Sequence, residues 1–120
     1  MMPARSRAAV ADDDPAFRQV LQEALERLGF DVVSFDDGDA LALAVIARPP
    51  DVVVTDQHMP VCHGTTALRR VRAAGVRCPA IVIAAFPEPE LEAEVGAIEG
   101  CVLLSKALDL AGLVAVLPRG

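Results

Sequence analysis

The chain has 120 residues, enough for one domain with a single core, and its net charge of −6 argues against binding nucleic acid or anionic membranes through a basic face. Hydrophobic residues make up 53% of the sequence and aromatic residues only 3%, so we expect an aliphatic core. No apolar stretch is long enough for a membrane span or a secretory signal, and three scattered cysteines without C-x-x-C match neither a disulfide framework nor a structural zinc site. We therefore predict a single cytoplasmic domain over residues 1–120, without direct contacts to nucleic acid or membranes.

Short apolar runs with strand composition alternate with helix-like segments along the chain. The predicted strands are Arg7–Ala11, Asp31–Phe35, Asp51–Thr55, Ala80–Ala84 and Cys101–Leu104. The runs Val32-Val33, Val52–Val54 and Ile81–Ile83 do not alternate with polar residues, which is typical of strands covered on both faces.

The segments between these runs have helical periodicity and recognisable ends. The first helix starts with Asp14 as N-cap and Pro15 at N1, and it ends at Gly29. Its predicted buried stripe contains Phe17, Val20, Leu21, Ala24, Leu25 and Leu28. The next three helices are predicted at about Asp39–Ala47, Thr65–Ala74 and Glu90–Ile98, and Asp109 is expected to cap a fifth that carries Leu110, Leu113, Val114 and Leu117.

Five strand–helix units in strict alternation predict an α/β domain with a five-stranded parallel sheet and helices on both faces. The flavodoxin-like strand order 2-1-3-4-5 fits this alternation best, with a core from about residue 8 to residue 117. In that order the first and third strands are neighbours.

Acidic residues stand where these two neighbouring strands end. Asp12-Asp13-Asp14 follows the first strand, and Asp56 follows the third. Because ligands gather at the carboxyl ends of parallel strands, these carboxylates should form one acidic pocket suited to a hard divalent cation. The opposing interpretation treats Asp12 and Asp13 as no more than a helix-capping cluster and Asp56 as an ordinary turn residue.

The ordered set of residues at the strand ends resembles the receiver domain of two-component response regulators. The set consists of Asp12-Asp13, Asp56-Gln57-His58-Met59-Pro60 with Gly64 beyond it, and Lys106 after the last strand. The resemblance extends from about Ala8 to Leu117 and implies a phosphoacceptor signalling domain that is not an enzyme beyond self-phosphorylation and self-dephosphorylation.

The resemblance also implies a role for each site residue. Asp56 would accept a phosphoryl group from a histidine kinase or phosphotransfer protein. Asp13, Asp56 and the backbone carbonyl of His58 would bind Mg²⁺ directly, and Asp12 would bind it through water. Lys106 would pair with Asp56 and then with the phosphoryl oxygens.

Three positions depart from the pattern of that family. Ala84 stands where the family has Thr or Ser, which forfeits a charge-assisted hydrogen bond of roughly 1.5–3 kcal/mol to the phosphoryl group. Leu103 replaces the aromatic switch residue, and Ala107 replaces the proline after Lys106. We expect a trans Lys106–Ala107 peptide and a displaced Lys106 loop, because a cis bond without proline costs about 3 kcal/mol.

These departures leave two alternative functions. In the first, a pseudo-receiver acts as a phosphorylation-independent interaction module through the surface of helices 4 and 5, which could also form a homodimer. In the second, the chain is a metal-dependent phosphohydrolase, but His58 stands where such enzymes carry a second acid.

No DNA-binding module follows Leu117, so the output is expected from a downstream protein target or from an output domain outside this sequence. A transition-metal site at His58, Cys62 and His63 matches no known ligand spacing.

Overall fold

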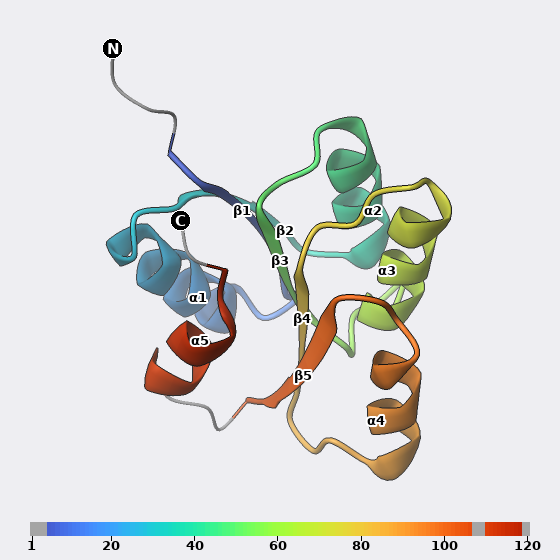
Figure 1. Ribbon diagram of the computed structural model, residues 1–120. Coiled ribbons are helices and arrows are strands. Elements are labelled where there is room, and N and C mark those ends of the chain that lie inside the picture. The colour runs from blue at the N-terminus through green and yellow to red at the C-terminus, as the bar shows by residue number, and fades with distance from the viewer. Residues whose placement is uncertain (1–4, 107–109, 119–120) are drawn as a thin grey trace.

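Five parallel strands form one sheet in the order β2-β1-β3-β4-β5 (Figure 1). The computed structural model describes residues 5–106 and 110–118 of the chain. The elements are β1 (Arg7–Ala11), α1 (Pro15–Arg27), β2 (Asp31–Phe35), α2 (Gly38–Ala47), β3 (Val52–Asp56), α3 (Gly64–Ala73), β4 (Ala80–Ala84), α4 (Pro89–Gly96), β5 (Cys101–Ser105) and α5 (Leu110–Val116). This arrangement confirms the predicted fold class and strand order.

Helices cover both faces of the sheet, with α1 and α5 on one face and α2, α3 and α4 on the other (Figure 1). Two aliphatic clusters fill the space between the layers. The cluster under α1 and α5 includes Val10, Leu21, Leu25, Val54, Ile83 and Leu113. The cluster under α2 to α4 includes Leu41, Val45, Val53, Leu68, Val71 and Val95. Both clusters lack large aromatic stacks, as the composition predicts.

Helix α1 begins and ends as predicted, but its buried stripe is narrower. The Asp14 carboxylate accepts a hydrogen bond from the backbone N–H of Ala16 at 3.0 Å, and Gly29 has a φ of +96° after the helix. Leu21 and Leu25 are buried, whereas Val20 is 60% and Leu28 40% exposed. The prediction that Val20 and Leu28 belong to the buried stripe is wrong, because only one side of the helix faces the sheet.

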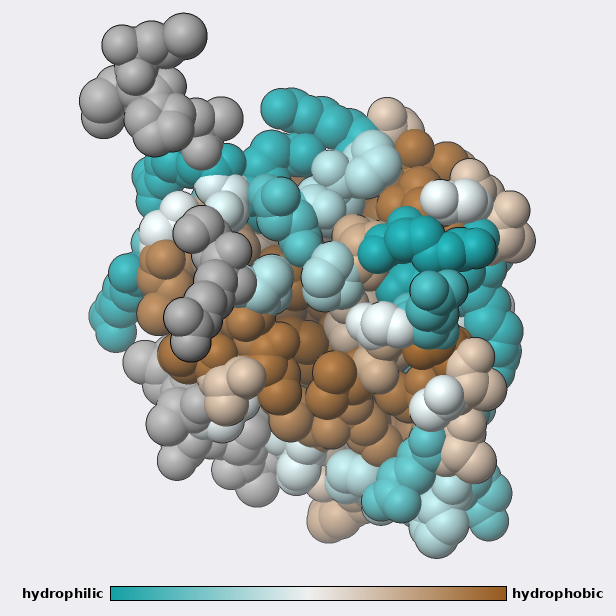
Figure 2. All heavy atoms as spheres, in the orientation of Figure 1, coloured by the Kyte–Doolittle hydropathy of each residue, from teal (hydrophilic) through white to brown (hydrophobic). Residues whose placement is uncertain are grey.

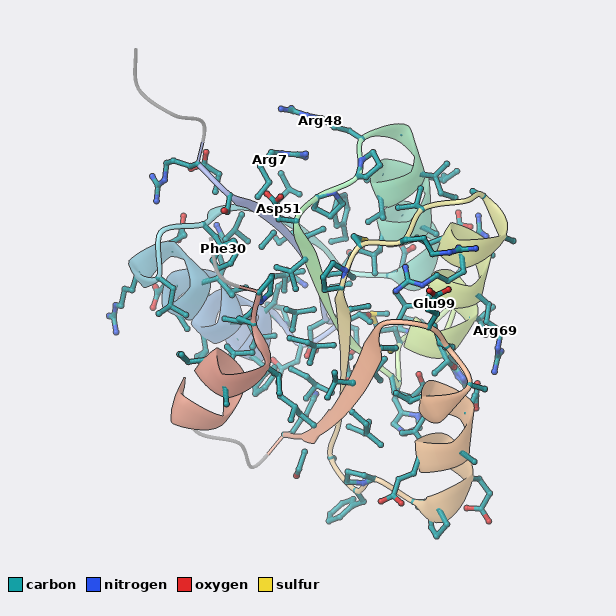
Figure 3. The ribbon with its side chains drawn as sticks, in the orientation of Figure 1. Arg7, Phe30, Arg48, Asp51, Arg69 and Glu99 are labelled. Carbon is teal, nitrogen blue, oxygen red and sulfur yellow. The ribbon has the colours of Figure 1, made fainter. Side chains whose placement is uncertain are left out.

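Several predicted boundaries are wrong by one or two residues, and a polar contact explains two of them. Asp51 precedes β3 because its carboxylate accepts the backbone N–H of Arg7 at 2.6 Å, and Figure 3 shows the two residues together. Helix α2 begins at Gly38 because Asp37 is its N-cap and accepts the N–H of Ala40 at 2.7 Å. The remaining shifts are at the ends of β3, α3, α4 and β5.

The two edge strands are more exposed than their apolar sequences predict. Val33 of β2 is 45% exposed, so the prediction that this strand is covered on both faces is wrong. Val102 of β5 is also exposed, and Figure 2 shows apolar residues gathered near this edge of the sheet, between α5 and α4.

None of the helices in the described part of the chain has the length and apolar character of a membrane span. The predicted Asp109 cap and the Lys106–Ala107 peptide involve residues outside the described ranges.

Candidate functional site

Three aspartates meet at the carboxyl edge of the sheet. Strands β1 and β3 are paired from Ala8 to Ala11, so Asp12 after β1 and Asp56 at the end of β3 emerge side by side. One carboxylate oxygen from each of Asp12, Asp13 and Asp56 lies within 4.8 Å of the others. Asp12 is fully buried and Asp56 is 3% exposed, whereas Asp13 is exposed. The pocket predicted from the sequence is therefore present.

The side chain of Lys106 enters the same pocket from the end of β5. Its Nζ lies 3.4 Å from Oδ2 of Asp56 and 3.5 Å from Oδ2 of Asp12. Its backbone N–H donates to the carbonyl of Ala84 at 2.9 Å, which ties the start of the Lys106 loop to the end of β4. The ammonium group thus pairs with two carboxylates, where the sequence predicted one.

An aromatic ring forms a further wall of the pocket. The Nζ of Lys106 lies 4.8 Å from the ring centroid of Phe17 in helix α1, a cation–π distance. The sequence placed Phe17 in a buried helical stripe and gave no signal for this contact, because the contact joins α1 to the end of β5.

One oxygen of Asp12 has an environment that fits a cation. Oδ1 accepts the backbone N–H of Asp14 at 2.9 Å, while Oδ2 is buried without a hydrogen-bond partner among the described residues. The Lys106 ammonium lies 3.5 Å from it. Because an unsatisfied buried carboxylate oxygen is costly, it favours binding of a hard cation. Together with Asp13 and Asp56 it supplies the all-oxygen donors that Mg²⁺ and Ca²⁺ prefer.

Burial and the neighbouring acids oppose the ionisation of the aspartates, whereas Lys106 and the aspartates favour one another's charged forms. Burial raises the pKa of Asp12, against the stabilising effects of the Asp14 N–H and of Lys106. Burial and the neighbouring Asp12 raise the pKa of Asp56. Partial burial opposes the charge of Lys106, but attraction by Asp12 and Asp56 outweighs it and raises the pKa of the ammonium group. Three acids with one base leave an excess of negative charge that a divalent cation would neutralise.

The loop after Asp56 is fixed by a buried polar pair that the sequence analysis missed. Oε1 of Gln57 accepts the backbone N–H of Thr65 at 2.9 Å, and Nε2 of Gln57 donates to Oγ1 of Thr65 at 3.0 Å. The Gln57 side chain thereby caps α3 from the end of β3. Gly64 packs against the carbonyl of Asp56 so closely that an added Cβ would lie 2.5 Å from its oxygen. The other predicted metal ligand, the carbonyl of His58, remains a prediction.

We expect the Phe17→Leu substitution to lower the pKa of Lys106, because a cation–π contact of about 0.5–1 kcal/mol at a partly exposed site favours the charged ammonium group. Lysine side-chain NMR titration measures this pKa directly. Phe30→Leu is the matched control, since Phe30 belongs to the core cluster that Phe17 packs against. An equal Lys106 pKa in the two variants would contradict a role for the Phe17 ring.

Comparison with known proteins places this geometry in a family. The model of the response regulator receiver domain matches residues 8–118. The chain is 30% identical over 112 residues to the DNA-binding transcriptional regulator NtrC of Salmonella typhimurium, covering 92% of this chain and 24% of that protein. It is 33% identical over 129 residues to the sensory/regulatory protein RpfC of Xanthomonas campestris pv. campestris, covering 94% and 17%. The chain thus spans about a quarter or less of the length of these relatives.

Solved structures agree with the sequence relatives. The receiver domain of the response regulator NarL from Mycobacterium tuberculosis superposes with a TM-score of 0.83 at 28% identity, covering 98% of this chain and 100% of that one. The receiver domain of the sensor histidine kinase PA1611 from Pseudomonas aeruginosa PAO1, which has a magnesium ion in its active-site cleft, gives a TM-score of 0.83 at 26% identity and covers 94% of each chain. The resemblance seen in the sequence is confirmed: the chain belongs to the receiver domain family of response regulators in two-component signalling.

Proposed function

We propose that this is a cytoplasmic domain that accepts a phosphoryl group on Asp56 from a histidine kinase or phosphotransfer protein. The observation that carries the proposal is the position of the Asp56 carboxylate, next to the acids at the end of β1 and to the ammonium group of Lys106. Phosphoryl transfer depends mainly on positioning the nucleophile and neutralising charge on the transferred oxygens. The pocket has the side chains for both tasks.

In the proposed reaction an Asp56 oxygen bonds to phosphorus, the bond from phosphorus to the partner's histidine nitrogen breaks, and the leaving imidazole takes up a proton. Asp13, Asp56 and the His58 carbonyl would hold Mg²⁺, with Asp12 acting through water. Bound Mg²⁺ would supply positive charge beside the phosphoryl oxygens. Lys106 would move its ion pair from Asp56 to those oxygens. The domain would catalyse no more than its own phosphorylation and dephosphorylation.

The signalling half of the proposed mechanism differs from that of typical family members. Ala84 at the end of β4 is buried and has no hydroxyl group to bind a phosphoryl oxygen, and Leu103 of β5 offers no aromatic ring to reorient. We therefore propose that phosphorylation is transmitted through another surface, that the domain stores or relays phosphate, or that partner binding completes the switch. The receiver of the signal would be a downstream protein or a linked output domain.

Treatment with a small phosphodonor and Mg²⁺ should add the mass of one phosphoryl group to the wild-type domain. Asp56→Asn should remain unmodified, because an amide is not a nucleophile for this reaction. Intact-protein mass spectrometry gives the readout, and Asp36→Asn, an exposed acid outside the pocket, should be modified like the wild type. An unmodified wild-type domain would defeat the proposal.

Ala84 also supports a second candidate, a pseudo-receiver that binds partners whatever its phosphorylation state. The exposed apolar edge of β5, which includes Val102, offers a surface between α4 and α5 for a target or for a homodimer. This function needs no metal. Identical Mg²⁺ titrations of the wild type and Asp13→Ala would favour it over phosphotransfer.

A further inference from the structure

A groove of about 310 Å³ opens at the carboxyl edge of the sheet, next to the phosphoacceptor strand. Its walls are Gln57 and His58 after β3, Ala85 and Phe86 after β4, and the beginning of α4. Because Asp56 is the last residue of β3 and pairs with β4, anything seated in the groove contacts both loops that leave the site.

The apolar part of the groove is centred on an exposed aromatic side chain. Phe86 is 84% exposed and has no ring or cation contact among the described residues, while Leu91 of α4 is largely buried and also lines the groove. Full burial of a phenylalanine side chain by a partner corresponds to about tenfold to hundredfold in affinity. Phe86 and Leu91 together give the groove an apolar surface that a partner's apolar side chain can cover.

The charge around the groove determines what kind of partner fits. The carboxylates of Glu88 and Glu90 have no ion-pair or hydrogen-bond partner within the described parts of the chain. Glu94, on the same side, is already paired with Arg69 (Figure 3 labels this arginine). A cation placed against Glu88 and Glu90 therefore gains attraction without breaking an existing pair, whereas an acidic partner is repelled.

We propose that this groove docks a segment of a protein partner in which an apolar side chain is flanked by lysine or arginine. The apolar side chain would pack on Phe86 and Leu91, and the basic residue would pair with Glu88 and Glu90. The inference rests on the proposed function in one respect, because it takes the partner to be a protein that gives phosphate to Asp56 or reads its phosphorylation.

Phage display tests which kind of segment binds in the groove. Random twelve-residue peptides are selected with the wild-type domain as bait. The recovered peptides should be enriched in a bulky apolar residue next to lysine or arginine. Synthetic copies are then measured by fluorescence anisotropy. Phe86→Ala should weaken binding at least about tenfold, and Glu88→Gln with Glu90→Gln about threefold to tenfold, with a weaker dependence on salt.

Two variants serve as matched controls. Glu92→Gln removes a charge from the same turn of α4 without touching the groove, and Leu43→Ala removes an exposed apolar side chain from α2. Both should bind the peptides within about twofold of the wild type. Recovery of acidic peptides, or of peptides that bind all variants equally, would overturn the proposal. A concentration-dependent dimer lost in Phe86→Ala, without peptide binding, would overturn it by assigning the groove to a second copy of the chain.

The small phosphodonor distinguishes the failure of this proposal from the failure of the proposed function. That reagent phosphorylates without a docked protein, so a modified wild-type domain that selects no basic apolar peptide disproves only the docking. A wild-type domain that stays unmodified disproves the phosphotransfer, whatever peptides it binds.

Discussion

Replacing Asp56 with asparagine should stabilise the metal-free domain by about 2 kcal/mol at neutral pH. At an effective dielectric constant of 20, each carboxylate pair in the pocket repels by about 3.5 kcal/mol, and the Lys106–Asp56 pair attracts by about 5 kcal/mol. Loss of the Asp56 charge removes repulsion from both Asp12 and Asp13 but only one attraction. The repulsion that the substitution removes exceeds the attraction that it removes, so the variant should be more stable than the wild type.

The pH dependence of this effect has a definite sign. Because the folded-state pKa of Asp56 is raised above its ordinary value of 3.8, the native state binds its proton more readily than the unfolded state does. The ionised carboxylate therefore destabilises the fold fully only above the raised pKa. The stability gain of Asp56→Asn should shrink as pH falls through that value and vanish below 3.8.

Urea unfolding in the presence of a chelator measures the difference, and Asp36→Asn is the charge-matched control. Adding Mg²⁺ should stabilise the wild type and Asp36→Asn more than Asp56→Asn, because the substitution removes a ligand. If Asp56→Asn is no more stable than Asp36→Asn without metal, the three acids are not in electrostatic conflict.

Replacing Gly64 with alanine should destabilise the domain by about 2–3 kcal/mol, near the upper end of the cost of overpacking. The new Cβ would lie 2.5 Å from the backbone oxygen of Asp56 and 3.2 Å from Cγ2 of Thr55. A backbone atom cannot move aside like a flexible side chain, so α3 or the end of β3 must shift. Phosphorylation of Asp56 by a small donor should slow accordingly.

The matched control is Gly96→Ala at the end of α4, where an added Cβ would have no neighbour within 4 Å. Alanine has the higher helix propensity, so this change should be neutral or stabilising by up to about 1 kcal/mol. Chemical unfolding and the rate of phosphoryl incorporation check both variants. Equal stabilities of Gly64→Ala and Gly96→Ala would show that the close approach to Asp56 is not a constraint.

The sequence predicted the fold because its signals are local. Continuous valine runs, the Asp14-Pro15 start of α1 and the glycine at its end each specify an element from a few neighbouring residues. The convergence of Asp12 and Asp56 followed from the strand order, since both stand at the ends of neighbouring strands. The position of Lys106 beside them was expected only from the resemblance to the receiver family.

Features that depend on contacts between distant elements could not be predicted. Val33 has the local sequence of a buried strand, and its exposure depends on which helices cover the edge strand β2, although the predicted strand order already placed β2 at that edge. The contact of Lys106 with the Phe17 ring and the Gln57–Thr65 pair each join two different elements. No periodicity or motif in the sequence indicates that these residues meet. Side-chain placement across elements is the part that the sequence alone leaves open.

The two hydrogen bonds between Gln57 and Thr65 couple the end of β3 to the first turn of α3. Both residues are buried, so separating them would leave an amide and a hydroxyl group unsatisfied. Any backbone shift at position 56 must therefore carry the start of that helix with it. In a domain whose fourth strand ends in alanine, this coupling offers a mechanical route by which a change at the proposed phosphorylation site, Asp56, reaches helix α3.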